Sequence, residues 1–279
     1  MQSNAYRDKD RDTLHIHPSE MAKDKWCGRQ TFYRISQIPP DSDKKAHFWR
    51  TANVFEEGHD IHEKYQGWLW EMGVLEGMWK CRVCDHRWWA LSPAVCNHCG
   101  SVFIEYAEVP ISLPDHLIIG HGDGIVTGFE DMGLPERVLL EIKSIGLGSV
   151  RYEVPGLYRT WKDNNESIEA LWGRIKRPFP AHVRQVHTYM HDLMNRLDIT
   201  TVMYIYEFKA TQDFKVFTAK YNPKIAEPLL DKALKVRRAR DSGKVPERPE
   251  WATDPKVEQC QECPYRGRCW GGQAGEEEE

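Results

Sequence analysis

The sequence predicts an α/β protein, because strand-like runs rich in β-branched and aromatic residues alternate with longer helical runs. The strand-like runs come as a group of three and then a pair, and a helical run separates the two groups. The strands are predicted at 104–112, 116–126, 137–145, 201–209 and 213–221, and the separating helix at 180–197. A chain of 279 residues is long enough to bury a core of its own, and we treat 1–279 as one domain.

The remaining elements follow from local patterns. Helices are predicted over 19–35 and 47–72, where apolar and aromatic residues recur at helical spacing. The segment 79–103 interrupts this pattern and, being dense in Cys, Trp and His, is expected to form a small inserted module. A basic helix is predicted over 223–240, whereas 147–178 fits no simple pattern.

Composition sets limits on function. The formal net charge of −4 excludes a surface coated in positive charge but allows nucleic-acid binding at a local cluster such as KALKVRRAR at 232–240. The alternative for that cluster is a solvated helix face. No apolar run approaches the roughly 18 residues that span a bilayer, and the charged N-terminus lacks the apolar core of a secretion signal. We therefore expect a cytoplasmic protein that does not bind membranes.

The run VLLEIKSIG at 138–146 is the most informative stretch of the sequence. Glu141 and Lys143 interrupt an apolar strand two residues apart, so their side chains leave the same face. Asp123, in GHGDGIV, adds a carboxylate from the preceding strand. Two carboxylates with a lysine suit Mg²⁺- or Mn²⁺-assisted hydrolysis. A strand-end Glu–Lys ion pair beside an unrelated turn aspartate explains the segment equally well.

These residues resemble a known family. Gly120 to Asp123 and Glu141 to Lys143 match the G-x-x-D and E-x-K motifs of the PD-(D/E)xK nucleases. Two further motifs, in the order typical of the RecB-like branch, are G-x-x-x-H and Q-x-x-x-Y; they fall on Gly58 and His62, and on Gln185 and Tyr189. The resemblance implies a restriction-endonuclease-like core in which helices flank a mixed central sheet.

The resemblance also implies roles for these residues. His62, Asp123, Glu141 and the main-chain carbonyl of Ile142 would bind Mn²⁺ or Mg²⁺, and Lys143 would help to activate the attacking water. Gln185 and Tyr189, which are four apart and share one helix face, would position the lysine and the DNA. Glu108 is a weaker candidate acid, because Glu105 competes with it.

The eight cysteines form two quartets, and metal ligation explains them better than disulfides do in a reducing cytosol. The first quartet has two C-x-x-C pairs separated by eleven residues, a spacing that predicts a structural zinc ribbon. Its members are Cys81, Cys84, Cys96 and Cys99. Trp88 and Trp89 between the pairs would either stack on bases or, as we favour, pack the ribbon onto the domain.

The second quartet is discontinuous. Three cysteines lie in the C-terminal region 258–271, and the early Cys27 completes the set; the other three are Cys260, Cys263 and Cys269. Spacing alone allows Zn²⁺ or a [4Fe–4S] cluster. This arrangement around the nuclease motifs resembles the iron–sulfur exonucleases typified by the CRISPR-associated "Cas-four" family, which implies a [4Fe–4S] cluster joining the N- and C-terminal regions. The zinc ribbon is a departure from that family's pattern.

The expected activity is that of a metal-dependent DNA exonuclease acting on single-stranded or unwound DNA in recombination, replication, repair or CRISPR adaptation. The sequence contains no G-x-x-x-x-G-K-[ST] motif, so ATP-driven unwinding would need a partner such as a helicase. Recombination proteins and a CRISPR integrase are other possible partners. The alternative is a non-catalytic DNA-end-binding subunit of a larger complex, although the intact Asp–Glu–Lys set favours an enzyme.

Overall fold

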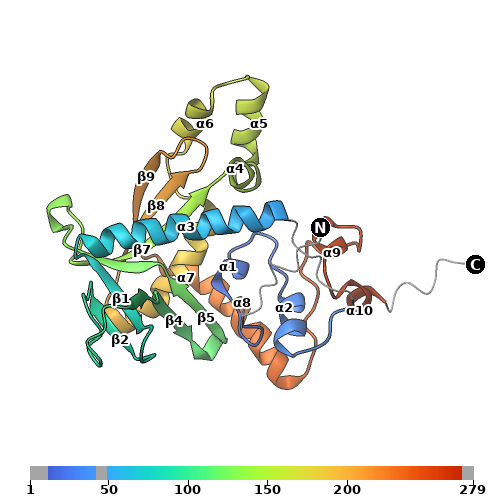
Figure 1. Ribbon diagram of the computed structural model, residues 1–279. Coiled ribbons are helices and arrows are strands. Elements are labelled where there is room, and N and C mark those ends of the chain that lie inside the picture. The colour runs from blue at the N-terminus through green and yellow to red at the C-terminus, as the bar shows by residue number, and fades with distance from the viewer. Residues whose placement is uncertain (1–11, 42–48, 272–279) are drawn as a thin grey trace, which may run out of the picture.

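A mixed sheet flanked by helices forms the centre of the molecule, as expected (Figure 1). The computed structural model describes residues 12–41 and 49–271. The main sheet has the order β2–β1–β6–β7–β8–β9, and β3 also pairs with β1. Among the described strands, β7 and β8 form the one parallel pair within this sheet. The strands are β1 (Leu75–Cys81), β2 (Arg87–Leu91), β3 (Ile104–Tyr106), β6 (Gly124–Thr127), β7 (Arg137–Ile145), β8 (Thr201–Phe208) and β9 (Phe214–Lys220).

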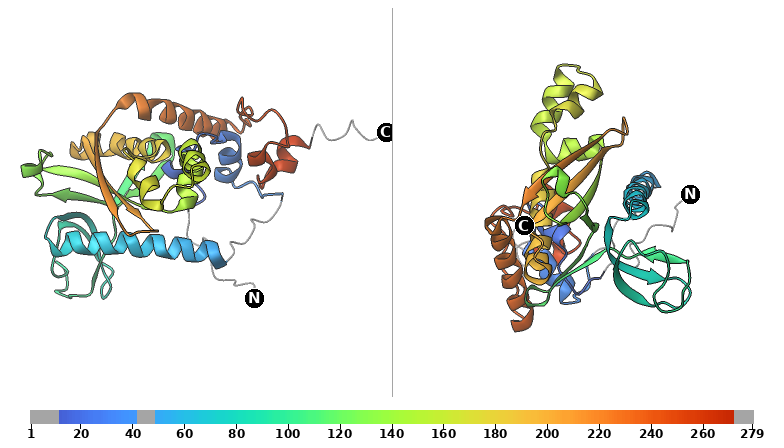
Figure 2. Two further views of the ribbon diagram at one scale, coloured as in Figure 1. Left: turned by 90° about the horizontal axis from the view of Figure 1, so that it is seen from above. Right: turned by 90° about the vertical axis from the view of Figure 1, so that its left-hand side faces the viewer.

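Two long helices, α3 (Trp49–Glu71) and α7 (Pro180–Leu197), lie on opposite faces of the sheet (Figure 2). Successive side chains of β7 point alternately toward α3 and α7. Ile142 therefore packs in one apolar cluster with Ile61 of α3, and Ile145 packs in another with Met190 of α7. No helix in the described part of the chain is long and apolar enough to cross a membrane. The shorter helices are α1 (Pro18–Met21), α2 (Gly28–Ile35), α4 (Leu147–Glu153), α5 (Pro155–Asp163), α6 (Ile168–Arg174), α9 (Glu258–Gln261) and α10 (Arg266–Trp270).

The prediction of one helix over 19–35 is wrong, because the structure has two helices there. Helix α1 ends at Met21, and α2 begins only at Gly28. Between them the chain turns and brings Cys27 to the N-cap of α2, where its Sγ accepts a hydrogen bond from the Gln30 N–H at 3.4 Å. The apolar spacing continues through the break because both helices pack into the same cluster. The helix predicted over 47–72 is α3, and positions 47 and 48 lie outside the described residues.

Two predicted strands are each divided in the structure. The run 104–112 becomes β3 and β4 (Val109–Leu113), because Glu108 has a φ of 60° and breaks the extended path. The run 116–126 becomes β5 (Ile118–Gly122) and β6, which belong to different sheets. Strands β4 and β5 form their own two-stranded sheet, and the chain crosses into the main sheet at Asp123.

The other long elements agree with the predictions to within a few residues. The runs 137–145 and 180–197 are β7 and α7, and the two later strands are β8 and β9. The basic helix is α8 (Pro223–Ser242). The stretch that fitted no pattern contains α4, α5 and α6, which stand out from the sheet as an arm (Figure 1).

The cysteine-rich segment 79–103 lies at one end of the main sheet. Its first strand, β1, begins at Leu75 and pairs with β6 through Leu75 and Glu76, so the segment continues the central sheet. Trp88 is 8% exposed and belongs to the apolar cluster beneath α3, and Trp89 donates its indole N–H to Glu76 at 2.7 Å. Trp88 is therefore packed in the core, and Trp89 is partly buried and held by its hydrogen bond to Glu76.

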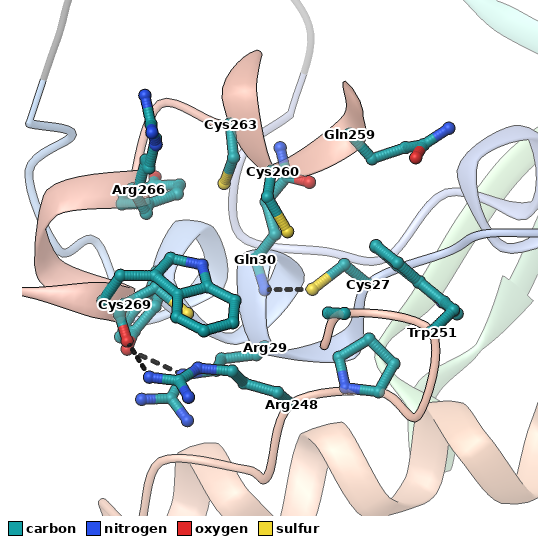
Figure 3. Close-up of a pocket in the computed structure, with 15 residues that line it drawn as sticks. Cys27, Arg29, Gln30, Arg248, Trp251, Gln259, Cys260, Cys263, Arg266 and Cys269 are labelled. Carbon is teal, nitrogen blue, oxygen red and sulfur yellow. Dashed lines mark hydrogen bonds between the residues drawn. The ribbon is translucent and has the colours of Figure 1, made fainter. Parts of the chain in front are cut away.

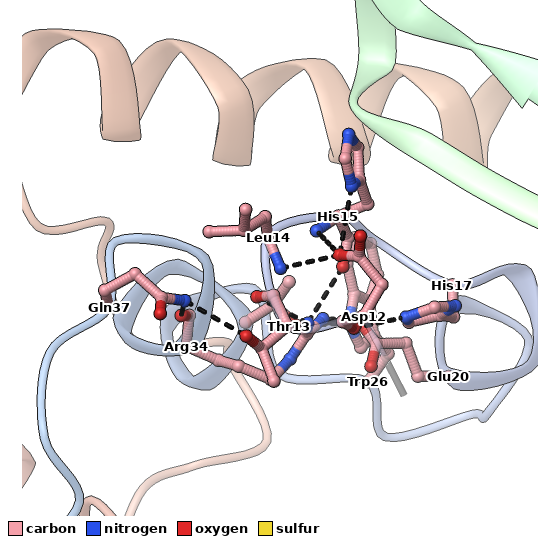
Figure 4. Close-up of polar contacts among 10 residues, drawn as sticks. Asp12, Thr13, Leu14, His15, His17, Glu20, Trp26, Arg34 and Gln37 are labelled. Atoms are coloured by element: carbon pink, nitrogen blue, oxygen red, sulfur yellow. Dashed lines mark hydrogen bonds and ion pairs between the residues drawn. The ribbon is translucent and has the colours of Figure 1, made fainter. Parts of the chain in front are cut away.

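Arg34 of α2 holds the loop at residues 13–15 against the domain (Figure 4). Its guanidinium donates to the carbonyls of Thr13 and His15 at 3.0 and 2.8 Å, and it pairs with Glu20 at 2.7 Å. The loop held in this way places Ile16 beside Ile118 of β5 in a parallel bridge. Helix α2 is thereby connected to the strand that leads into Asp123.

Cations of α8 hold the same layer together. Lys232 donates to the carbonyl of Trp26 at 3.0 Å, and Arg237 donates to that of Asp115 at 2.5 Å. Lys235 and Arg238 of the same helix are exposed. Two cations of the cluster 232–240, Lys232 and Arg237, thus have a structural role, whereas Lys235 and Arg238 are exposed.

Candidate active site and metal centres

Asp123 lies at the centre of the candidate active site, where the chain passes from β5 to β6. It is 8% exposed, and its Oδ2 accepts a hydrogen bond from the Ile142 N–H at 2.5 Å. Strand β6 pairs with β7 only as far as Gly124 and Leu140. Beyond Leu140, this edge of β7 has no part of strand β6 beside it, and Asp123 lies there instead. The C=O of a strand residue faces the same side as its N–H, so the Ile142 carbonyl also faces the carboxylate.

His62 reaches the site from the middle of α3. Its Nδ1 is 3.3 Å from Asp123 Oδ1. Gly58, one turn earlier, faces β7, because a Cβ added there would lie 3.4 Å from Ser144 Oγ, an ordinary contact distance. One turn after His62, Gln66 donates its side-chain amide to the Asp123 carbonyl at 2.9 Å. His62 and Gln66, one turn apart, therefore hold α3 against Asp123, and Gln66 is a residue that sequence analysis missed.

Glu141 and Lys143 extend from the α7 face of β7, as their spacing predicted. Lys143 Nζ is 2.6 Å from Glu141 Oε1, and Glu141 is 1% exposed. Glu141 Oε2 is buried and has no hydrogen-bond partner among the described residues. A buried carboxylate oxygen without a partner is costly, and a bound cation would satisfy it. Burial raises the pKa of Glu141 to about 7, although Lys143 opposes this shift.

Glu108 completes the group of ligand atoms, and its side chain is one that sequence analysis ranked below the others. Its carboxylate oxygen, one Asp123 oxygen and a His62 nitrogen all lie within 4.8 Å of one another. The pKa of Glu108 is raised to about 7. Burial is the main cause, and the negative charge of nearby Asp123 is the second. The competing Glu105 instead pairs with Arg82 at 2.7 Å, away from this group. The positive φ at Glu108 turns its side chain inward, which no sequence pattern indicates.

The protonation of the other three groups is controlled by their neighbours. Burial alone would raise the pKa of Asp123, but His62 and Lys143 lower it. Burial would lower the pKa of His62 and Lys143, but the carboxylates beside them raise both. The group is thus a set of compensating charges in a buried place, and such sets occur where a protein binds a cation or catalyses a reaction.

Helix α7 closes the other side of the site. The Gln185 amide donates to the Tyr189 hydroxyl at 2.7 Å, which agrees with the shared helix face that their spacing predicted. Tyr189 touches Gly120, where an added Cβ would be 3.1 Å from the ring, so the glycine permits this close approach. The pKa of Tyr189 is raised, mainly by burial and next by the negative charge of Glu141, and this keeps the phenol protonated. His182, one turn before Gln185, forms a hydrogen bond with Tyr206; sequence analysis did not single out this histidine.

The contrast between Glu108 and Glu105 allows a matched test. We expect Glu108→Gln to weaken Mn²⁺ binding by about 10- to 100-fold, the cost typical of losing a group that supports a metal site. Glu105→Gln should leave the affinity unchanged, because Glu105 pairs with Arg82. Titration calorimetry on both variants measures the difference. Equal affinities would remove Glu108 from the site.

The first cysteine quartet forms a compact group at the end of the sheet. All four Sγ atoms lie within 4.8 Å of one another; Cys81 and Cys99 are 3.6 Å apart, and Cys84 and Cys96 are 3.8 Å apart. Four sulfurs placed about 2.3 Å from one tetrahedral zinc ion lie roughly 3.8 Å apart. The quartet therefore has the dimensions of a single-ion site.

The two turns of this quartet are built alike. In each, the residue two positions after the first cysteine donates its N–H to that cysteine's Sγ at 3.4 Å. The residue after the second cysteine has a positive φ, 55° at Asp85 and 74° at Gly100. Backbone N–H groups that face the sulfur stabilise a thiolate, which is the form that binds metal.

The second quartet lines one pocket between α2 and the C-terminal helices (Figure 3). Cys27 contributes from the N-cap of α2, and Cys260, Cys263 and Cys269 contribute from the region of α9 and α10. In this quartet, unlike the first, no three sulfurs lie within 4.8 Å of one another in the described part of the chain. Its sulfurs are therefore spaced more widely than those of the first quartet. Burial raises the pKa of Cys263 to about 11.

Comparisons with known proteins give similarities of chain path alone. Neither a protein-family model nor a curated protein matches the sequence. Among solved structures, LHK-Exo in complex with dAMP is similar with a TM-score of 0.45 at 10% identity, over 83% of this chain and 90% of that one. The alkaline exonuclease LHK-Exo from Laribacter hongkongensis is similar with a TM-score of 0.43 at 11% identity, over 83% of this chain and 90% of that one. SSO0001 is similar with a TM-score of 0.37 at 11% identity, over 91% of this chain and 85% of that one.

Proposed function

We propose that this protein is a metal-dependent DNA nuclease whose active site is centred on Asp123. The observation that carries the proposal is the cluster of ligand atoms from half-buried His62 and Glu108 and buried Asp123. It lies beside Glu141, whose Oε2 has no hydrogen-bond partner among the described residues. These donors are carboxylates and one imidazole, a set that suits Mn²⁺ or Mg²⁺. The resemblance of the sequence motifs to PD-(D/E)xK nucleases supports the same assignment.

In this proposal, His62, Asp123, Glu141 and the carbonyl of Ile142 hold the ion, and Glu108 supports it. When bound, the ion polarises the scissile phosphate and lowers the pKa of a water molecule. Lys143 would orient the attacking water and stabilise the negative charge that develops on the phosphate.

Gln185 and Tyr189 form the α7 side of the site, where their hydrogen bond fixes the phenol near Glu141. We assign these two residues to positioning Lys143 and the DNA strand. A buried phenol whose pKa is raised remains a hydrogen-bond donor to phosphate.

The substrate that we propose is single-stranded or unwound DNA, and cleavage proceeds from an end. The support is the resemblance to RecB-like exonucleases, in which the same motifs occur in the same order. The proposed cellular setting is recombination, replication, repair or CRISPR adaptation. A helicase, a recombination protein or a CRISPR integrase would act as the partner in that setting.

The two cysteine quartets are proposed to be structural centres of different kinds. The spacing of Cys81, Cys84, Cys96 and Cys99 suits one Zn²⁺ ion. The wider pocket of Cys27, Cys260, Cys263 and Cys269 suits a larger group, and we assign it a [4Fe–4S] cluster. Trp251, which lines this pocket, has a buried indole N–H without a hydrogen-bond partner among the described residues. Such a donor can be satisfied by sulfur.

The test of the proposed function is Mn²⁺-dependent degradation of end-labelled single-stranded DNA by wild type and Lys143→Ala. We expect the variant to be slower by roughly 100- to 10,000-fold, the contribution typical of a group that assists proton transfer. Lys235→Ala, at an exposed lysine of α8, is the control and should match wild type. Equal rates for Lys143→Ala and wild type would remove the catalytic assignment, and DNA-end binding without cleavage by wild type would favour the non-catalytic subunit.

A further inference from the structure

His182 belongs to the side of α7 that closes the active site. It precedes Gln185 by three residues and Tyr189 by seven, so at about 100° per residue the three side chains leave the helix within roughly 60° of one another. Gln185 and Tyr189 line the site from this side and are joined by their own hydrogen bond. His182 therefore faces the site as well, one turn nearer the start of the helix.

Strand pairing places the His182 ring beside Lys143. Tyr206 of β8 is the direct neighbour of Lys143 in the parallel ladder, and Tyr206 belongs to the apolar cluster on the α7 face of the sheet. His182 Nδ1 and the Tyr206 hydroxyl form a hydrogen bond. The imidazole also packs against the rings of Phe179 and Tyr206, with centroid distances of 5.5 and 5.4 Å. It is thus held in a defined position one strand away from Lys143.

The hydrogen bonds around Tyr206 determine which nitrogen of His182 carries the proton. The Phe179 N–H donates to the Tyr206 oxygen at 2.9 Å, so the hydroxyl proton is left to point at His182 Nδ1. Nδ1 is then the acceptor, and the single proton of a neutral imidazole is assigned to Nε2. Burial, and next the positive charge of Lys143, lower the pKa of His182 well below its usual value, so the ring carries no charge at neutral pH. His182 therefore presents an N–H donor at Nε2.

This donor has no acceptor in the described part of the chain. Nε2 forms no hydrogen bond there, and unlike the fully buried atoms without a partner, such as Glu141 Oε2, it keeps some exposed surface. Lys143 beside it is also only a donor, and its ammonium contacts Glu141 at 2.6 Å. Two neighbouring donors cannot bond each other, and both suit an anion that accepts hydrogen bonds. A DNA phosphate is such an anion.

We propose that His182 donates its Nε2–H to a phosphate oxygen of the DNA strand that is bound at the Asp123 site. This inference rests on the proposed nuclease function and adds a substrate-binding residue to it. A neutral donor can bind phosphate without placing a second positive charge beside Lys143, where like charges would repel. The contact is made to the backbone and not to a base, so it does not select a sequence.

DNA with single neutral linkages tests this contact. Single-stranded oligonucleotides carry one methylphosphonate, in each of its two stereoisomers, at successive linkages from the end. Binding is measured with Ca²⁺ in place of Mn²⁺, and gel analysis confirms that the DNA stays intact. At one linkage, the neutral group should weaken binding to wild type by about 10- to 100-fold, the equivalent of ~1.4–2.8 kcal/mol at 1.4 kcal/mol per tenfold and typical of a hydrogen bond to a charged group.

Two substitutions distinguish the two ends of the imidazole. Glutamine can place its amide N–H near the position of Nε2, so His182→Gln should bind DNA much as wild type does. Asparagine reaches only as far as Nδ1, so His182→Asn should bind unmodified DNA about 10- to 100-fold more weakly and lose most of its response to the neutral linkage. His191→Asn is the matched control and should bind as wild type does, because His191 bonds Tyr221 at 2.8 Å on the opposite side of α7.

Three results would contradict these expectations in different ways. Equal losses in His182→Asn and His182→Gln would mean that the ring only supports the fold, and would overturn the contact; melting temperatures lowered alike would accompany this result. Equal binding by His182→Asn and wild type, while wild type cleaves DNA, would also overturn the contact and leave the nuclease in place. Failure of wild type to bind or cleave any of these DNAs would instead contradict the proposed function.

Discussion

Asp123→Asn should lower Mn²⁺-dependent DNA cleavage by at least about a thousandfold, because charge stabilisation by a bound ion is worth several kcal/mol and ~1.4 kcal/mol is tenfold in rate. The amide keeps the shape of the side chain and can still accept the hydrogen bond from the Ile142 N–H. It removes the negative charge that faces His62 at 3.3 Å. The ion loses a ligand while the fold retains its local packing, so Mn²⁺ affinity should fall together with the rate.

Cleavage of end-labelled DNA and calorimetric Mn²⁺ binding measure these two effects, and thermal unfolding reports on the fold. Asp115→Asn is the matched control, because the Asp115 side chain is 93% exposed and pairs only with Arg237 among the described residues. That variant should cleave and bind Mn²⁺ as wild type does. Retention of both properties by Asp123→Asn would place the metal elsewhere in the protein.

Cys27→Ser should abolish iron binding and lower both the solubility and the melting temperature. The thiolate of Cys27 would tie the start of α2 to the three cysteines near α9 and α10, which are more than two hundred residues later. Joining such distant segments restricts the unfolded chain, and the energy of binding the cluster contributes to folding. The anchor of the N-terminal loop, Arg34, lies in the same helix, so loosening α2 would also loosen β5.

Metal analysis of anaerobically purified protein measures this effect. Wild type should be brown and contain close to four irons and one zinc per chain. Cys84→Ser is the matched control, because it removes an exposed ligand of the compact quartet and should lose zinc while keeping iron. Unchanged iron in Cys27→Ser would mean that the fourth ligand is another residue, and colourless wild type with two zincs would contradict the cluster.

Local rules were sufficient for some of the site. The spacing of Glu141 and Lys143 predicted that they share a face, and the 2.6 Å contact between them agrees with this. The four-residue spacing of Gln185 and Tyr189 predicted that they share one helix face, and the hydrogen bond between them agrees with this. In both cases the geometry depends only on the period of one element, and a sequence displays that period directly.

Other features depend on how distant elements meet, and the sequence does not display them. Glu105 and Glu108 have similar neighbours in the chain, and they are distinguished by a positive φ that turns Glu108 toward His62. The break before α2 was hidden because apolar residues on both sides pack into one cluster. The crossing of the chain between two sheets at Asp123 was equally hidden, because an uninterrupted strand-like run covers it.

The parallel pairing of β7 with β8 has a consequence for the order of folding. Strands β6 and β7 pair across a short connection, so the half of the site that contains Asp123 and Glu141 can form from local contacts. Strand β8 pairs with β7 only after the long connection that contains the arm and α7 has closed, and closing such a long loop is slow. We therefore expect the carboxylates to be assembled early in refolding, and Gln185 and Tyr189 to join them late. Ion binding should then precede the recovery of DNA cleavage in time.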